Sequence, residues 1–234
     1  MRVVAFQYSA RTGHFLRAES GSSWLTYPFP PRTALLGLIG AILGLEKDSP
    51  QDILKGAHLA VSGAVPKTHW HKAQLRQEVY SVGRKFSATK EDNAKLQNQE
   101  WLWCPSYLIF AALPEDHQSS FEKRLEEKSY YFSPCMGMSE MFALIDYKGA
   151  FDGHMLPEGE LEICSVFPRK VGKMNVKKCL SQELALSYTQ MPYDVTLQRD
   201  FSLKDYVYER DGKPIPIRTD SAWKVGEYPP IVFL

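Results

Sequence analysis

The sequence predicts an α+β protein, in which short apolar strands alternate with two helical segments. Three observations support this prediction: an apolar N-terminal run with strand character, a helix-length apolar segment after a cluster of prolines, and a second, amphipathic helical segment further along. The composition, 44% hydrophobic and 24% charged, is ordinary for a globular protein, and 234 residues are enough to bury a hydrophobic core.

The predicted fold begins with a strand and a helix. Residues 3–8 combine β-branched and aromatic side chains, which favours a strand at the N-terminus. Residues 32–45 are apolar or small at nearly every position, so we expect a helix that is covered on most sides. Gly37, Gly40 and Gly44 predict that this helix closely approaches a sheet or another subunit.

Further strand and helix signals follow along the chain. We expect strands over 58–65, 101–113 and 141–147, separated by a basic insertion and by an amphipathic helix over 115–128. The resulting order is β-α-β, insertion, β-α-β. This is the order of the ferredoxin-like, or RRM-like, fold, which we therefore predict for residues 1–150.

The remaining residues, 151–234, are predicted to form a small β-rich C-terminal appendage. The strands expected there are 160–167, 184–188, 206–209 and 214–218. Segment 169–178 holds five basic residues and no acidic one. From the sequence, its binding partner stays open between RNA, target DNA and none.

The insertion has the composition of a site for single-stranded nucleic acid. Residues 67–90 contain six Lys or Arg, two His and one acid, Glu78, with aromatic residues interleaved. Cations that follow phosphates and aromatic faces that stack on bases are what such a site requires. The alternative is a solvated loop with an accidental positive bias. The polar stretch 88–100 is expected to be an exposed tip or a mobile loop.

Two further loops hold candidate RNA ligands. Arg11, His14 and Arg17 follow the first strand, where an RNA strand can lie along a sheet edge. Gly137, at the centre of residues 134–140, would let backbone N–H groups approach a phosphate. The alternatives are that His14 packs at the end of the strand and that the glycine serves a tight turn.

His69, His71 and Lys72 raise the possibility of catalysis. Histidine can remove a proton from a 2′-hydroxyl, and lysine can stabilise the developing negative charge in metal-independent RNA cleavage. Alternating strand positions place His69 and His71 on one face, which also suits simple phosphate binding. We expect no metal site, because these histidines have no obvious third ligand and the four cysteines form no CxxC pair.

Bulk properties bound the remaining possibilities. The formal net charge is +1, so an argument for RNA binding depends on where the charges lie. The apolar runs are too short for a signal peptide or a membrane span, so we expect a cytoplasmic protein without membrane contact. No nucleotide-binding or hydrolase motif is present, and no cofactor is expected.

Three stretches together resemble one known family. They are GHFLR at 13–17, LTYPFPPRTALLGLIGAILGL at 25–45 and SPCMGMSEMFA at 133–143. In this order, they make the chain similar to the fifth CRISPR-associated protein family. The resemblance implies a ferredoxin-like domain with an inserted thumb hairpin, here about residues 66–100.

The resemblance also implies a role and partners. Members of the family form the foot of a type I Cascade, bind the 5′ handle of the crRNA, and contact the large subunit and the backbone subunits. Target DNA near the PAM end is a further candidate partner. The N-terminal motif is more similar to the type I-B branch, whose subunit is non-catalytic. In type I-C, the subunit cleaves precursor crRNA with tyrosine, lysine and histidine, and Tyr27, His71 and Lys72 are of these types.

We therefore predict a non-catalytic RNA-binding subunit of a type I Cascade. The predicted RNA-binding residues are Arg11, His14, Arg17, Arg32, Lys72, Arg76, Arg84, Lys85, Gly137, Met138 and Ser139. If the protein is instead a metal-independent endoribonuclease, the candidate catalytic residues are Tyr27, His69, His71 and Lys72. The third alternative is a mainly structural adaptor, in which the apolar helix over 31–45 meets a protein partner.

Overall fold

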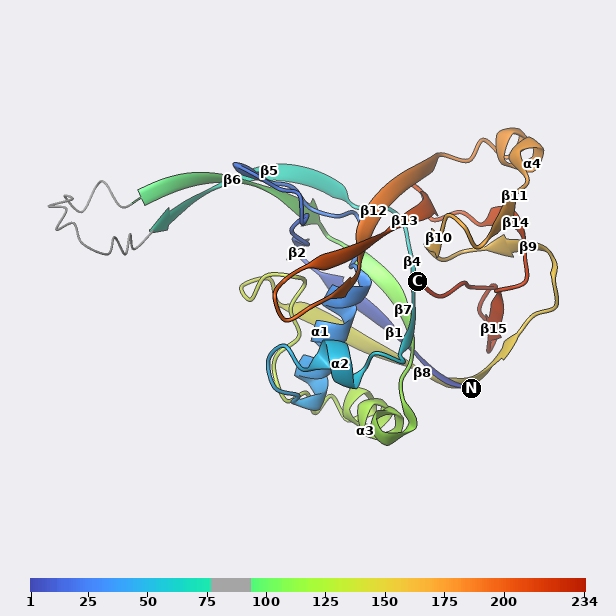
Figure 1. The fold of residues 1–234 in the computed structure, drawn as a ribbon, viewed down its shortest axis with the longest axis horizontal. Helices are drawn as coiled ribbons and strands as arrows, with labels where there is room; N and C mark the ends of the chain where they lie inside the picture. Colours follow the sequence, from blue (N-terminus) through green and yellow to red (C-terminus); the bar gives the residue numbers. More distant parts are fainter. Residues whose placement is uncertain (77–93) are drawn as a thin grey trace, which may run out of the picture.

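The structure of the protein is a computed structural model that describes residues 1–76 and 94–234 (Figure 1). Within these residues the fold is mixed α+β, made mostly of strands, with four helices. None of the helices in the described part of the chain is both long and apolar enough to cross a membrane. The predicted RNA ligands Arg84 and Lys85 lie outside the described residues.

A five-stranded antiparallel sheet forms the centre of the first part of the chain. Its strands, in spatial order, are β15 (Trp223–Val225), β8 (Ala143–Met155), β1 (Arg2–Ala10), β7 (Ser106–Ala112) and β4 (His58–Ser62). Each neighbouring pair is antiparallel. Apart from β15, these strands have the sequence order that the hydrophobic pattern predicts, with helices after β1 and β7.

Both faces of this sheet are buried, which follows from the alternation along β1. Val4 and Phe6 face the main core with Leu35 of helix α1 (Arg32–Leu43), while Val3 belongs to a core cluster on the opposite face. Helix α3 (Glu115–Glu126) presents Phe121 to the main core, where its ring lies 6.0 Å from that of Phe6. Both predicted helices are therefore confirmed, with slightly earlier ends.

Gly40 and Gly44 allow α1 to approach neighbouring segments closely, but these segments are not strands of the sheet. A Cβ at Gly40 would overlap Pro50, in the short helix α2 (Pro50–Ile53), and one at Gly44 would come within 2.6 Å of the Tyr131 ring. Gly44 also ends α1, because it adopts a left-handed φ of 81° and its N–H bonds to the Gly40 carbonyl. Gly37 faces open space.

The insertion forms a two-stranded hairpin that extends away from the rest of the molecule (Figure 1). Strand β5 (Lys67–Arg76) pairs with β6 (Ala94–Trp103), and the other edge of β6 pairs with β2 (Thr12–Gly13) and β3 (Ser23–Trp24). The expectation of a loop over 88–100 is wrong from Ala94 onward. Gln97 and Gln99 are buried in β6, although their polar side chains made an exposed loop the expected structure.

The C-terminal region is rich in β-structure, as predicted, and contains two three-stranded sheets. The first consists of β10 (Phe167–Pro168), β13 (Phe201–Glu209) and β12 (Leu186–Val195). The second consists of β11 (Gly172–Met174), β14 (Ile215–Thr219) and β9 (Gly159–Ile163). Helix α4 (Val176–Ser181) follows β11 along the chain. The boundary expected at residue 150 falls inside β8, and β15 returns to pair with that same strand.

Candidate nucleic-acid interface

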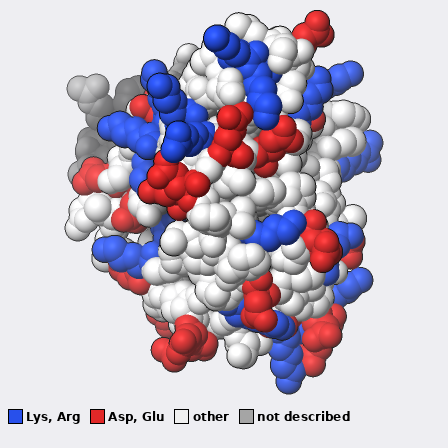
Figure 2. All heavy atoms as spheres, turned by 90° about the vertical axis from the view of Figure 1, so that its right-hand side faces the viewer, with Lys and Arg blue, Asp and Glu red and all other residues white. Residues whose placement is uncertain are grey.

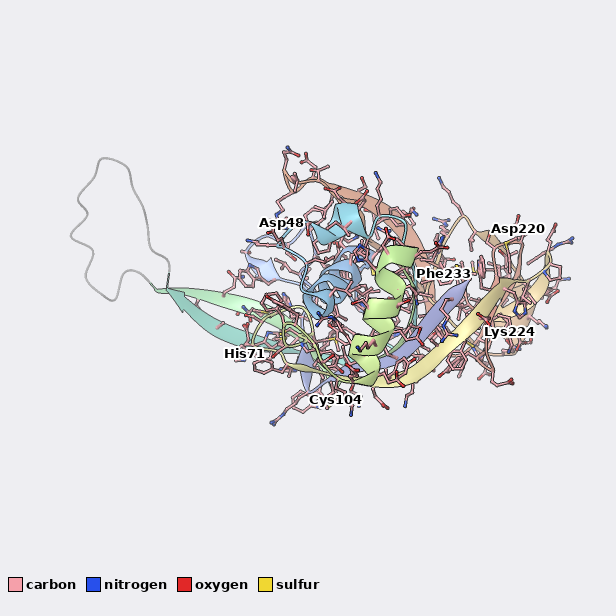
Figure 3. All side chains as sticks on the ribbon, turned by 90° about the horizontal axis from the view of Figure 1, so that it is seen from below. Asp48, His71, Cys104, Asp220, Lys224 and Phe233 are labelled. Atoms are coloured by element: carbon pink, nitrogen blue, oxygen red, sulfur yellow. The ribbon has the colours of Figure 1, made fainter. Side chains whose placement is uncertain are left out.

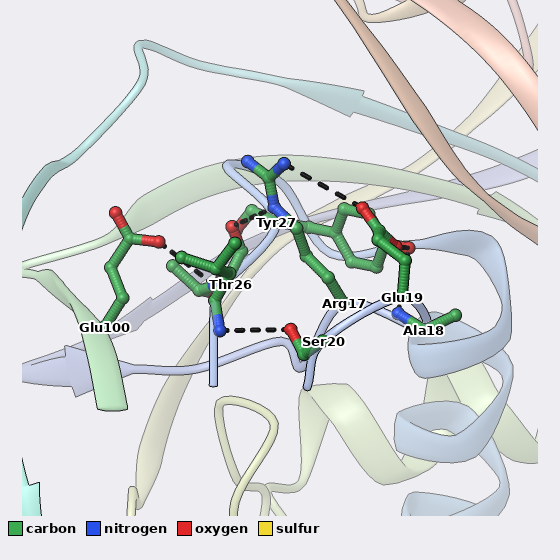
Figure 4. Close-up of polar contacts among 8 residues, drawn as sticks. Arg17, Ala18, Glu19, Ser20, Thr26, Tyr27 and Glu100 are labelled. Carbon is green, nitrogen blue, oxygen red and sulfur yellow. Dashed lines mark hydrogen bonds and ion pairs between the residues drawn. The ribbon is translucent and has the colours of Figure 1, made fainter. Parts of the chain in front are cut away.

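The segment between β1 and α1 folds back on itself and against β6 (Figure 4). The N–H of Tyr27 bonds to the Phe15 carbonyl at 2.8 Å, and Arg17 Nε donates to the Thr26 carbonyl at 3.0 Å. The N–H of Thr26 donates to Glu100 Oε2 at 3.1 Å. These bonds fix the first predicted RNA loop to the base of the hairpin.

His14 is held inside this arrangement, 2% exposed. Its Nδ1 lies 2.7 Å from the backbone carbonyl of Glu100. A carbonyl only accepts, so Nδ1 carries the proton and a neutral ring presents Nε2 as an acceptor. Burial lowers the pKa of His14, which favours the neutral ring, while the Glu100 carbonyl acts in the opposite direction. Nε2 has no hydrogen-bond partner within the described residues.

The glycine loop lies directly against His14. Gly137 has a φ of 91°, and a Cβ at this position would overlap the carbonyl of His14. The N–H of His14 bonds to the Met136 carbonyl at 3.0 Å. The need for glycine at 137 therefore has an explanation within the chain, and close approach to RNA is not required to account for it. Ser139 is exposed and donates to Glu140.

A pocket of about 290 Å³ opens where the first loop, the glycine loop and the start of α1 meet. Its wall includes His14, Tyr27, Gln51, Gly137, Met138 and Phe201. The structure thus brings together three of the predicted RNA ligands, His14, Gly137 and Met138. Gln51 and Phe201 gave no signal in the sequence, because they reach the pocket only through the packing of α2 and β13.

One face of the hairpin carries a second group of candidate residues. His71 stacks on Trp101 across the strand pair, with ring centroids 3.9 Å apart and planes 23° apart. His69 meets Trp101 and Trp103 edge-on, at 5.8 and 5.4 Å. The two tryptophans were not among the predicted site residues. The sequence could have indicated them, because both the tryptophans and the histidines stand at alternate positions of their strands. Residues at alternate positions of paired strands share a face.

The opposite face of the hairpin carries Trp70, which is 58% exposed, and Lys72, which is also exposed. Figure 3 shows His71 toward the base of the hairpin, with Asp220 and Lys224 at the far end of the molecule. Arg76 ends β5 and pairs by backbone with Ala94. Lys67, which is exposed and pairs with Trp103, shares the face of His69 and His71, so the hairpin presents aromatic rings and a cation on both faces.

The structure separates the candidate catalytic residues. His71 and Lys72 are consecutive in β5, so their side chains point to opposite faces. Tyr27 is 1% exposed in the pocket wall, and its hydroxyl donates to Glu19 Oε2 at 3.1 Å. Burial raises the pKa of Tyr27, which makes its phenolate harder to form. Across residues 1–76 and 94–234, no three His, Cys, Asp or Glu side chains cluster as metal ligands.

The expectation that Arg32 faces RNA needs correction. Arg32 is 4% exposed, and its guanidinium donates to the carbonyls of Lys55 at 2.7 Å, Ala57 at 3.3 Å and Tyr193 at 3.3 Å. It also lies 4.8 Å from the ring centroid of Tyr193. Three of its five N–H donors are occupied by backbone carbonyls, so Arg32 joins α1 to the C-terminal region.

The two predicted arginines of the first loop remain accessible. Arg11 is exposed, and its backbone carbonyl accepts from the N–H of Cys104 at the end of the hairpin. Arg17 is half-buried and lies 5.7 Å from the Tyr27 ring centroid, with Glu19 at 3.9 Å. Both lie within the segment that borders the pocket and the hairpin, where a backbone phosphate could be contacted.

The basic stretch 169–178 is partly neutralised. Figure 2 shows the C-terminal end of the molecule, where basic side chains gather toward the top among acidic ones. Lys178 lies 3.4 Å from Glu160 and 4.0 Å from Glu162, and Arg169 lies 5.3 Å from the Tyr188 ring centroid. Of the five basic residues, only Lys178 has an acidic partner within the described part of the chain, so most of the positive charge of this stretch remains uncompensated there.

Comparisons with known proteins identify the family and agree with the fold. Residues 4–155 match the family model described as CRISPR-associated protein (Cas_Cas5). A chain of a solved "CRISPR RNA-guided surveillance complex" is similar in fold, with a TM-score of 0.58 and 12% identity over 92% of this chain and 91% of that one. A CRISPR protein from Archaeoglobus fulgidus has a TM-score of 0.53 and 12% identity, with both chains fully covered. No curated protein sequence matches the chain. The family match spans well over half of the chain and confirms the resemblance found in the sequence: this protein belongs to the CRISPR-associated Cas_Cas5 family.

Proposed function

We propose that this protein is a non-catalytic RNA-binding subunit of a type I CRISPR surveillance complex. Its RNA is the 5′ handle of the crRNA, and it bridges the large subunit and the backbone subunits, with target DNA near the PAM end as a further partner. The strand order β8-β1-β7-β4, antiparallel throughout, supports a ferredoxin-like core, and hairpin β5–β6 is the candidate thumb. The fold similarity to a surveillance-complex chain supports the assembly.

The observation that carries this proposal is the exposed aromatic surface of the hairpin. Trp70 and Trp103 are 58% and 46% exposed, on opposite faces of a two-stranded extension. Such rings in water are unfavourable unless a partner covers them, and base stacking on aromatic rings is tolerant of sequence. Lys72, on the same face as Trp70, supplies a phosphate contact.

The endoribonuclease remains the rival function. Its residues would have to converge on one 2′-hydroxyl, whereas His71 and Lys72 point to opposite faces and Tyr27 is held by Glu19. These observations favour binding without cleavage. The structural adaptor is less well supported, since most of the apolar surface of α1 is already covered within the chain.

The proposal is tested by incubating the purified protein with a labelled CRISPR repeat RNA in EDTA. We expect a shifted, intact RNA. A plot of log affinity against log salt concentration should become shallower by about 0.7 in Lys72→Gln, which is the value for one phosphate contact on a single strand. Lys123→Gln, an exposed lysine on α3, is the matched control and should leave the slope unchanged.

Two outcomes would contradict the proposal. Defined cleavage fragments that disappear in His71→Ala or Tyr27→Phe would establish the endoribonuclease. The absence of any shift, with a protein that melts cooperatively, would show that the isolated chain does not hold RNA and would favour the adaptor.

A further inference from the structure

A groove of about 860 Å³ runs beside α1, on a side of the helix that the rest of the chain leaves uncovered. Its wall combines residues of α1 with segment 44–55, with Tyr131 and Phe132, and with residues 194–199 at the turn between β12 and β13. None of the predicted RNA ligands within residues 1–76 and 94–234 lines this groove. Its role is therefore separate from the contacts assigned to the hairpin and the first loop.

Large apolar side chains stand exposed around the groove. Tyr131 and Phe132 are 63% and 55% exposed, with ring centroids 4.8 Å apart, and Leu197 is 71% exposed. The N–H groups of Tyr131 and Phe132 bond to the carbonyls of Ile42 and Ala41 at 3.2 and 3.1 Å, which holds both residues against the end of α1. Exposed aromatic and aliphatic side chains that gather around one concavity are typical of a surface that binds another protein.

Gly37 lies in the middle of α1 and has no role in the packing of the described chain. It is exposed in the groove, and a Cβ at this position would have no atom within 4 Å. Gly40 and Gly44, in contrast, make room for Pro50 and Tyr131. Glycine is a poor helix former, so at position 37 it weakens α1 without a gain inside the chain. The free space above Gly37 is therefore available to a partner.

The charges around the groove disfavour nucleic acid. They belong to four acidic and three basic residues, namely Glu46, Asp48, Asp52, Asp194, Lys47, Lys55 and Arg199. Arg199 is already paired with Asp48 at 2.7 Å. Of the remaining charges, three are acidic and two are basic, so a chain of phosphates would be repelled. Glu46 and Asp52 are exposed and form no ion pair among the described residues, so a basic side chain of a protein partner can meet them.

The floor of the groove has the shape of a helix-packing surface. The residues that α1 contributes recur every three or four positions along one face of the helix and are small: Thr33, Gly37, Ala41 and Gly44. Small side chains let a second helix axis approach closely, and this face is about 16 Å long, the length of three helical turns. An extended segment would find no backbone partner on α1, because the N–H and C=O groups of a helix bond to each other.

We propose that this groove receives an amphipathic helix of another protein subunit of the surveillance complex. The helix places large apolar side chains over Gly37 and Ala41, contacts Phe132 and Leu197, and brings a basic side chain to Glu46 or Asp52. That the partner belongs to this complex rests on the proposed function. The inference adds the position of the docking surface and the chemistry of the segment that occupies it.

The test is assembly of the whole complex with substitutions of increasing size at Gly37. The chain is co-expressed with the other protein subunits and the crRNA, and the complex is purified through a tag on a backbone subunit. Gly37→Ala, Gly37→Leu and Gly37→Trp should melt at or above the wild-type temperature, since nothing in the chain opposes the added side chain. The isolated variants should also shift the repeat RNA as wild type does.

The amount of the chain recovered in the complex should fall as the side chain at position 37 grows. We expect a loss of about tenfold for Gly37→Trp, the effect of blocking one central contact of an interface. Ser120→Trp adds the same ring to an exposed position of α3 outside the groove and should assemble as wild type does. Leu197→Ser, at a highly exposed position, is the second groove variant in case Gly37→Trp lowers the melting temperature.

A photo-crosslink identifies the occupant directly. Phe132 is replaced by p-benzoylphenylalanine, and the complex is irradiated and digested for mass spectrometry. We expect attachment to a peptide of another protein subunit that has apolar residues at helical spacing and a flanking lysine or arginine. Attachment to the crRNA, or to a second copy of this chain, would overturn the proposed occupant.

The outcomes separate this inference from the function on which it rests. If wild type, Gly37→Trp and Leu197→Ser all enter the complex equally, the groove is not a docking site, and the proposed function stands. If the wild-type chain itself is missing from the purified complex, the proposed function fails, and the assignment of the partner fails with it.

Discussion

Hairpin β5–β6 and the pocket at the start of α1 offer RNA two opposite kinds of surface. On the hairpin, large rings are exposed, and Trp70 and Trp103 reach 58% and 46%. In the pocket, His14 and Tyr27 are 2% and 1% exposed, and their polar atoms bond to Glu100 and Glu19. The hairpin suits contacts that tolerate any base, whereas bonds within the chain hold the side chains around the pocket in fixed positions.

The comparison also separates binding from folding. Trp70, Lys72 and Trp103 of the hairpin are exposed, so their replacement should change RNA affinity with little effect on the free energy of unfolding. Pocket residues belong to the bonding of the first loop, so their replacement should change both quantities. The predictions below test this division, from the largest expected effect to the smallest.

Arg32→Ala should give the largest effect, and only on folding. Removing the guanidinium leaves the buried carbonyls of Lys55, Ala57 and Tyr193 without their donor. We expect the free energy of unfolding to fall by about 3 kcal/mol, measured by urea denaturation. RNA affinity of the folded protein should be unchanged.

The control for Arg32 is Arg169→Ala, which also removes an arginine beside a tyrosine ring. Arg169 is exposed and lies 5.3 Å from the Tyr188 centroid, so its loss should change unfolding by about 0.5 kcal/mol or less. If Arg32→Ala instead weakened RNA binding without a change in stability, Arg32 would return to the interface, and the separation of folding from binding would fail.

Gly137→Ala should have the next largest effect, and on both quantities. The backbone at φ 91° is strained for alanine, and the added Cβ would overlap the His14 carbonyl. We expect a loss of about 2 kcal/mol in unfolding free energy, together with weaker RNA binding as His14 and the pocket shift. Calorimetric melting and gel shift measure the two.

Gly21→Ala is the control for Gly137, because a Cβ at Gly21 meets open space. It should leave stability unchanged or raise it slightly. A stable Gly137→Ala variant with normal RNA affinity would mean that the glycine loop is not tightly coupled to His14, and the pocket would then resemble the hairpin in its tolerance.

Much of the fold could be predicted from the sequence because its order follows local patterns. The apolar run at 32–45 and the amphipathic pattern at 115–128 predicted α1 and α3, and the alternation in 3–8 predicted β1. Strand β6 was missed, because Gln97 and Gln99 are buried by a loop distant in sequence, in which the Ser22 carbonyl accepts from Gln97. Polar residues buried by tertiary contacts have no local signature.

The candidate site was likewise predicted where its features are local in the sequence and missed where they depend on long-range packing. The basic and aromatic composition of the hairpin is visible locally, and so was predicted, although Trp101 and Trp103 were not singled out. Arg32 was placed at the interface wrongly, because one of its carbonyl partners lies at Tyr193, 161 residues away. Gln51 was missed for a similar reason, since only the packing of α2 against α1 brings it to the pocket.

The smallest expected effect concerns pH and the buried imidazole. Burial lowers the pKa of folded His14, so between that pKa and about 6.5, the value for an unfolded histidine, the unfolded chain binds the extra proton. His14 should therefore contribute its full stability above pH 6.5 and lose it as the pH falls through this window. Unfolding free energies of wild type and His14→Asn, measured from pH 7.5 to 5, should converge at the acidic end, because other titrating groups are common to both. A constant difference would mean that folding leaves the pKa of His14 unchanged. A difference that grows toward acidic pH would mean that His14 is protonated in the fold, with Nε2 as a donor.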